Sequence, residues 1–167
     1  MTEQKALTSP APSELERILN FVETMPPEHA LYLDDVGWFQ LHHYKAYDGR
    51  NPRTGERVFV PQKALLMFQS DLNLISVLNG RPREDLGDPT HGAPDVVIHR
   101  FGWAQSIARQ VFQELVANGV TEIAGFGTLR VEQREVEYPD GTRVSENRPL
   151  WEMSEQLRDR LVATVAR

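Results

Sequence analysis

One stretch of the sequence joins turn residues, positive charge and a strand: Gly49-Arg50-Asn51-Pro52-Arg53-Thr54-Gly55-Glu56-Arg57-Val58-Phe59-Val60-Pro61. Its first half is typical of a turn, because Gly49 and Gly55 permit positive φ and a proline follows Asn51. Its second half, residues 57–60, reads as a strand, and residues 42–47 read as its partner. The stretch therefore predicts a long β-ribbon with a basic tip. Because few large apolar residues lie at the tip, we expect the ribbon to project and meet a partner.

Composition narrows the class of protein. The chain has 167 residues, of which 40% are hydrophobic, so it can fold around a core without covalent staples. It contains no cysteine, which excludes disulfides, thiol catalysis and thiolate zinc sites. No apolar run approaches the roughly 20 residues of a membrane-spanning helix, and residues 1–13 lack the apolar segment of a signal peptide. We therefore expect a cytoplasmic protein. The net charge of −6 confines any nucleic-acid site to a local patch.

The first half predicts a helix, a split strand, the ribbon and a second helix, in that order. Apolar residues at helical spacing follow Ser13, a candidate N-cap, and Pro26-Pro27 stops the helix. Asp34-Asp35 turns the strand that leads into the ribbon. The predicted elements are a helix from Ser13 to Met25, strands over 31–33 and 36–41, the ribbon, an apolar run over 64–68 and a helix from a cap at Ser70-Asp71 to Asn79-Gly80.

The second half repeats this order after a linker. An offset of 90 residues places 36–41 on 126–131, and an offset of 83 places Phe68 on Trp151, so the second ribbon is shorter by the difference. Neither half has enough helix to cover its own strands, and we expect the two to share one core. The elements predicted here are an apolar run over 96–98 of undecided type, a helix from Gln105 to Asn118, a strand pair over 123–131 around a glycine turn, a hairpin over 136–144 turning at Asp140-Gly141, and a last helix opened by residues 153–155.

These residues resemble the HU and integration host factor family of bacterial architectural DNA-binding proteins. The resemblance rests on residues 36–39, on the GRNPRTGE run at 49–56, on Val60-Pro61 and Phe68, and on a similar glycine turn at 125–129. It covers most of residues 14–78 and 101–165. It implies an α+β fold of two HU/IHF-like half-units in one chain, with helices packed on antiparallel strands, protruding β-arms, and the halves paired as an intramolecular pseudodimer.

The resemblance also implies double-stranded DNA as the partner, held by the arm through the minor groove and the phosphates. In that family the proline at the arm tip wedges between base pairs, and the position carrying that proline here is Pro52. Asn51 lies beside it in the turn. The residues placed where phosphate or minor-groove contacts are expected are Lys45, Arg50, Arg53, Arg57 and Lys63.

Three features depart from the family. Its first helix is missing from both halves. The second ribbon has no GRNP run, and its tip is Tyr138-Pro139-Asp140-Gly141, where we expect an ordinary turn. The two ribbons also differ in charge. Residues 129–150 of the second hold four basic and five acidic side chains, whereas residues 42–63 of the first hold five basic and two acidic ones. We therefore expect the first arm to bind DNA and the second not to do so.

Other candidate sites have simpler explanations. His42-His43, His91 and His99 lack the spacing of metal ligands, so no metal site is expected. Asp34-Asp35 lie where aspartate is favoured in a turn, which explains them better than catalysis does. No phosphate loop, catalytic triad or metal cluster occurs, so we expect neither an enzyme nor a cofactor. The aromatic residues expected to pack rather than stack on bases are Trp38, Phe39, Phe68, Phe112, Phe126 and Trp151.

The predicted organisation is a loose tail at 1–12, a first HU-like unit at 13–78, a linker at 79–95 and a second HU-like unit at 96–167. The preferred function is non-enzymatic, largely sequence-tolerant bending or wrapping of duplex DNA, in the nucleoid of the cytoplasm and with no membrane. The alternative is a protein-interaction or assembly module that kept the fold and lost most DNA binding, which the net acidity favours. Self-association is a further alternative, since two chains can exchange halves across the linker.

Overall fold

A computed structural model describes residues 7–8, 12–81, 94–138 and 140–165. Helix α1 spans Pro12–Glu23 and buries Ile18, Leu19 and Val22 on one face. It begins at Pro12, so Ser13 lies in its first turn and the predicted cap there is wrong; proline suits the first helical position, where no N–H partner is needed. The predicted stop before Pro26 is confirmed.

The rest of the first half is a three-stranded meander followed by a short helix. Asp71 caps that helix as predicted, because its carboxylate accepts a hydrogen bond from the Asn73 N–H at 2.7 Å, and Gly80 ends it in the left-handed conformation. The elements are β2 (His29–Leu33), β3 (Gly37–Tyr44), β6 (Lys63–Ser70) and α2 (Leu72–Asn79), with β4 (Tyr47–Arg50) and β5 (Arg57–Val60) inserted between β3 and β6.

The second half has the same order of elements as the first. A 3-10 turn at Gly102–Ala104 leads into α3, which ends at Asn118 with Gly119 as its left-handed cap, as predicted. The predicted hairpin over 136–144 is the distal end of a much longer one. Strands β9 and β10 pair without a break from Gly127 opposite Met153 to Glu137 opposite Arg143. The elements are α3 (Gln105–Asn118), β8 (Val120–Ile123), β9 (Gly127–Glu137), β10 (Arg143–Met153) and α4 (Glu155–Val165).

Each half completes the sheet of the other. The two four-stranded sheets have the strand orders β6-β3-β2-β7 and β1-β8-β9-β10, and β4 and β5 form a separate two-stranded sheet. The undecided apolar run forms β7 (Val97–His99), which lies at the start of the second half yet pairs in parallel with β2 of the first. Conversely β1 (Leu7–Thr8), in the predicted tail, precedes the first half and pairs in parallel with β8 of the second. Two short strands therefore tie the halves together crosswise.

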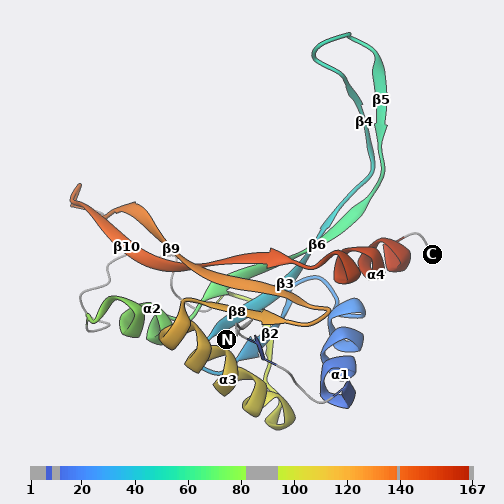
Figure 1. Ribbon diagram of the computed structural model, residues 1–167. Helices are drawn as coiled ribbons and strands as arrows, with labels where there is room; N and C mark the ends of the chain where they lie inside the picture. Colours follow the sequence, from blue (N-terminus) through green and yellow to red (C-terminus); the bar gives the residue numbers. More distant parts are fainter. Residues whose placement is uncertain (1–6, 9–11, 82–93, 139, 166–167) are drawn as a thin grey trace, which may run out of the picture.

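Buried residues from both halves form one core. The ring of Phe39 in β3 lies 5.2 Å from that of Phe126 and 4.9 Å from that of Trp151, centroid to centroid. Phe68 and Phe112 pack against the same core, whereas Trp38 is not part of it and packs on the Tyr32 ring, with 4.9 Å between ring centroids. Helices α1, α2 and α3 lie on one side of the strands, and the ribbon of β4 and β5 rises from the other (Figure 1).

Among the residues described, no helix is long and apolar enough to span a membrane.

Candidate nucleic-acid interface

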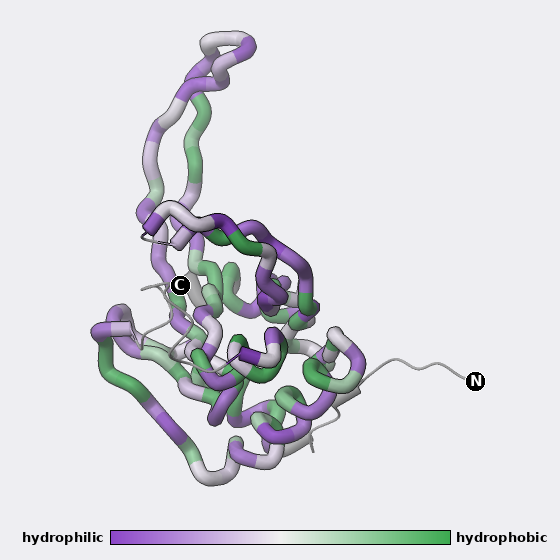
Figure 2. The backbone as a smooth tube through the Cα atoms, turned by 90° about the vertical axis from the view of Figure 1, so that its left-hand side faces the viewer, coloured by the Kyte–Doolittle hydropathy of each residue, from purple (hydrophilic) through white to green (hydrophobic). Residues whose placement is uncertain are grey.

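The ribbon of residues 42–63, here called the first arm, stands clear of the body, with a hydrophobic stretch along one of its strands (Figure 2). Its pairing keeps one register throughout, because Tyr44 opposite Lys63 and Tyr47 opposite Val60 belong to the same alignment. The ladder is interrupted only around Pro61, which has no N–H to donate. Gly49, predicted to form part of the turn, instead lies in β4 opposite Val58. The projecting arm is thus confirmed and its turn is shorter than expected.

The tip of the first arm is a loop organised by Asn51. The Asn51 N–H donates to the Glu56 carbonyl at 2.8 Å, its carbonyl accepts from the Gly55 N–H at 2.7 Å, and its side-chain oxygen accepts from the Arg53 N–H at 2.8 Å. Gly55 has φ of +76°, a conformation that glycine adopts without strain. Pro52 and Arg53 lie at the apex and are exposed.

The structure places all five predicted cations of the first arm in solvent. Arg50 and Arg57 face each other across the ladder, and the Arg50 guanidinium donates to the Gly55 carbonyl at 3.0 Å. Lys63 lies over the Tyr44 ring at 5.7 Å, near the base of the arm. Within the described residues, no carboxylate forms an ion pair with Lys45, Arg50, Arg53, Arg57 or Lys63. The positive charge of the arm is therefore available to an external anion.

The two most exposed aromatic residues of the first arm escaped the sequence analysis. Tyr47 is 60% exposed and Phe59 is 65% exposed. Phe59 pairs with Asp48 and shares a face of the ribbon with Arg50 and Arg57, whereas Tyr47 lies on the other face. Their exposure could have been predicted, because a ribbon that projects from the body has no core against which either face can pack.

A groove lies between β6 and β10, the edge strands of the two sheets that meet below the first arm. It has a volume of about 590 Å³. The Trp151 indole N–H of β10 donates to the Leu66 carbonyl of β6 at 2.9 Å, which joins the two edges. Its lining includes the half-exposed Met67 and Leu150, together with three cationic side chains, Arg134, Arg148 and Arg158, and one acidic side chain, Glu152.

The second hairpin, residues 127–153, presents a different surface. Its tip turns at Asp140-Gly141 as predicted, and Pro139 lies outside the described residues. The Thr142 N–H donates to the Asp140 carboxylate at 2.9 Å, which lowers the pKa of that aspartate. Arg143 beside the tip lies 3.7 Å from both Glu135 and Glu137. Its positive charge is therefore already matched within the hairpin.

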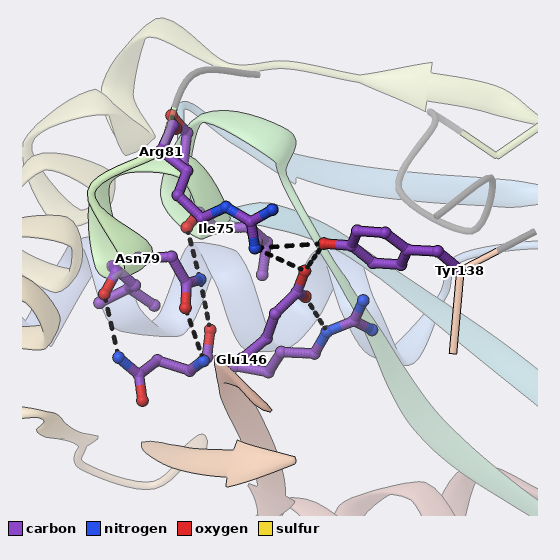
Figure 3. A network of polar contacts seen from close by, with 9 residues as sticks. Ile75, Asn79, Arg81, Tyr138 and Glu146 are labelled. Carbon is purple, nitrogen blue, oxygen red and sulfur yellow. Dashed lines mark hydrogen bonds and ion pairs between the residues drawn. The ribbon is translucent and has the colours of Figure 1, made fainter. Parts of the chain in front are cut away.

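A polar network fastens the second hairpin to α2 (Figure 3). Glu146 is 1% exposed, and its carboxylate accepts from Arg148 at 3.1 Å and from the Tyr138 hydroxyl, with Arg81 at 3.9 Å. Burial, and then the hydrogen bond to Glu146, raises the pKa of Tyr138. Asn79 and Asn147 bond reciprocally. The Asn147 backbone N–H donates to the Asn79 side-chain oxygen at 2.7 Å, and the Asn79 side-chain amide donates to the Asn147 carbonyl at 3.0 Å.

The other predicted sites have local partners. Asp34 makes a two-pronged ion pair with Arg100 at 2.6 and 2.9 Å, and Asp35 accepts from the Asn73 amide at 2.9 Å. His42 and His43 are exposed at the start of the first arm, while His99 lies 2.8 Å from His29. His91 falls outside the described residues. In the part of the chain that the structure describes, no three His, Cys, Asp or Glu side chains are placed to hold a metal ion.

Residues 16–79 match the family model described as bacterial DNA-binding protein. The match begins in α1, ends with α2 and contains the whole first arm. It supports the resemblance of this half of the chain to the HU and integration host factor family. No curated protein matches the chain significantly.

Proposed function

We propose that the protein is a non-enzymatic, HU-like architectural DNA-binding protein, largely sequence-tolerant, that bends or wraps duplex DNA through its first arm. The observation that carries this proposal is a projecting ribbon with five cations that have no ion-pair partner among the described residues, inside a segment that matches a bacterial DNA-binding family. A cluster of unpaired cations favours a polyanion, because each phosphate contact releases condensed counterions. The proposed place of action is the bacterial nucleoid.

The arm tip supplies the proposed wedge. Pro52 is exposed at the apex and is followed by Arg53, while the hydrogen bonds of Asn51 fix the loop on which both lie. An apolar wedge that unstacks a base step in the minor groove has a cost of a few kcal/mol, which wider protein contact with the bent duplex offsets. In this proposal Pro52 is the wedge, Asn51 positions it, and Lys45, Arg50, Arg53, Arg57 and Lys63 contact phosphates or the minor groove.

The groove below the arm supports a path for the rest of the duplex. It lies where β6 carries the arm back into the body, and Arg134, Arg148 and Arg158 line it. A duplex gripped by the arm would extend along the side of the groove formed by β6 and α4, where Arg158 lies, because Arg148 on the hairpin side is already paired with Glu146. Phosphate contacts there would be independent of sequence and sensitive to salt.

We also propose that residues 96–167 form a second, divergent HU-like unit, paired with the first inside one chain. The shared order of helix, three strands and helix supports this assignment. So does a common glycine position, since a Cβ added at Gly37 would meet the Phe68 ring and one added at Gly127 would meet the Trp151 ring. The single core supports pairing within the chain rather than exchange between two chains.

A protein-interaction module is the second candidate function. It is favoured by the net charge of −6 and by the exposed aromatic rings of Tyr47 and Phe59 on the arm. Such rings are enriched at protein interfaces. This candidate differs from DNA binding in its dependence on salt, because burial of an aromatic ring is not screened by ions.

Duplex retardation in a gel, at low and moderate salt, separates the two candidates. We expect the natural protein to retard a short duplex at low salt, and we expect this retardation to disappear as the salt concentration rises. The Arg50→Glu/Arg53→Glu variant should not retard it, whereas Arg109→Glu, an exposed reversal on α3, should retard it. Equal retardation by the natural protein and the double variant, or no retardation by either, would contradict the proposal.

A further inference from the structure

The second hairpin is fixed to the parts of the body that support the first arm. Asn147 bonds Asn79 and the Leu78 carbonyl at the end of α2, at 2.7 to 3.1 Å. Trp151, on the same strand, bonds the Leu66 carbonyl of β6, the strand by which the first arm returns to the body. The second hairpin is therefore bonded both to the end of α2 and to the strand by which the first arm returns to the body.

The buried carboxylate of Glu146 makes this attachment specific. It is 1% exposed, and the groups around it are Arg148, Arg81 and the Tyr138 hydroxyl. Tyr138 lies beside the tip of the hairpin, and its hydroxyl meets both the Glu146 carboxylate and the guanidinium of Arg81, which follows α2 (Figure 3). Releasing the tip would leave a buried carboxylate with fewer partners, which is costly.

The first arm and the tip of the second hairpin also differ in charge. Arg143 at the second tip already lies between two carboxylates, whereas no carboxylate pairs with the cations of the first arm within the described residues. The second tip also carries the exposed Asp140, which like any exposed aspartate is ionised at neutral pH. Phosphates would be repelled there and attracted at the first arm, within a screening length of about 10 Å at 0.1 M salt.

From these contacts we infer that the protein holds a duplex from one side only, with the second hairpin serving as a brace for the base of the first arm. This inference rests on the proposed function. One gripping arm gives one wedge, so each bound protein distorts the duplex at one place. The complex is also directional, because one projection contacts the duplex and the other does not.

Site-directed crosslinking tests the inference, because the chain has no cysteine of its own. Thr54→Cys and Thr142→Cys put the same exposed substitution at the two tips, and Ser145→Cys is a second exposed probe on the braced hairpin. Each variant carries a benzophenone maleimide and is irradiated with an end-labelled 40-base-pair duplex. We expect a covalent adduct with Thr54→Cys and no adduct above background with Thr142→Cys or Ser145→Cys. All three variants should retard the duplex to a similar extent in a gel.

Each outcome decides between the two proposals. Adducts of equal yield from both tips, or from Thr54→Cys and Ser145→Cys, would overturn the one-sided grip and leave DNA binding intact. Retardation without any adduct would overturn the first arm as the contact, and with it the inference. Absence of retardation by the natural protein would overturn the proposed function itself.

Discussion

Arg50 and Arg57 lie directly opposite each other in the ladder of β4 and β5. Like charges at such a position destabilise a two-stranded ribbon by a few tenths of a kcal/mol to about 1 kcal/mol. We predict that Arg57→Thr weakens duplex binding and lowers the slope of log affinity against log salt by about 1. Because the substitution relieves the repulsion, the free energy of unfolding should not fall and should rise by at most about 1 kcal/mol. Titrations at several salt concentrations, beside urea denaturation, measure both quantities.

Val58→Thr is the matched control for this prediction. Val58 is 41% exposed, lies next to Arg57 and points to the other face of the ribbon. Its replacement removes no charge, so the salt slope should stay as it is in the natural protein. If Arg57→Thr and Val58→Thr give the same slope, Arg57 does not contact a phosphate.

Gly37 and Gly127 should both be intolerant of a side chain. A Cβ at Gly37 would lie 2.2 Å from the Gln69 carbonyl oxygen, and one at Gly127 would lie 2.5 Å from the Glu152 carbonyl oxygen. Backbone cannot move aside as a flexible side chain does. We predict that Gly37→Ala and Gly127→Ala each destabilise the fold by about 3 kcal/mol, measured by urea denaturation.

Gly102→Ala is the control, because nothing lies within 4 Å of a Cβ there. It should leave stability within about 0.5 kcal/mol of the natural value. A tolerated alanine at Gly127, beside an intolerant Gly37, would show that the two positions are not equivalent and would weaken the assignment of a second HU-like unit.

The elements that sequence reasoning predicted are those with a strong local signal. The helix over Gln105–Asn118 has apolar periodicity and a glycine cap, and the first arm has Pro52 between turn residues. Strands β1 and β7 have two and three residues, too few for any periodicity to appear. They form because a sheet edge in the other half accepts them, which is information that no local stretch contains.

The same contrast applies to the candidate interface. The exposed cations of the first arm follow from the GRNPRTGE run, since no apolar face accompanies them. The attachment of the second hairpin does not follow, because it joins Asn79 to Asn147 across 68 positions of the chain. Glu146 reads in the sequence as one more surface acid, yet it is buried against Arg148 and Tyr138. Only the folded arrangement shows that this hairpin is bonded to α2.

Asn79 is predicted to stabilise the brace. Its side chain bonds the Ile75 carbonyl, the Asn147 carbonyl and the Asn147 N–H, at 2.7 to 3.0 Å. Asn79→Ala leaves the two groups of Asn147 without these partners and should destabilise the protein by about 1–3 kcal/mol. It should also speed amide hydrogen exchange in β10. Asn73→Ala, which removes one exposed bond on the same helix, is the control and should change neither by as much.

Tyr32 makes stability depend on alkaline pH. Burial, and then the hydrogen bond from its hydroxyl to Asp71 at 2.5 Å, raises the pKa of Tyr32 from 10.0 to about 12. The folded state therefore holds the phenol proton more tightly than the unfolded state does. The contribution of Tyr32 is fully present below about pH 10 and is lost as pH rises to about 12.

Urea denaturation of Tyr32→Phe beside the natural protein measures that contribution. At pH 8 the variant should be less stable by about 1 kcal/mol, because Asp71 loses a donor. This difference in stability should shrink as pH rises from 10 to 12. Over that range the Tyr32 phenol of the natural protein loses its proton and with it the hydrogen bond to Asp71, whereas the variant has no phenol to lose. Tyr47→Phe, on the exposed arm, should show no difference at either pH. A difference for Tyr32→Phe that stays constant over this range would mean that the phenol is not held protonated by Asp71 and burial.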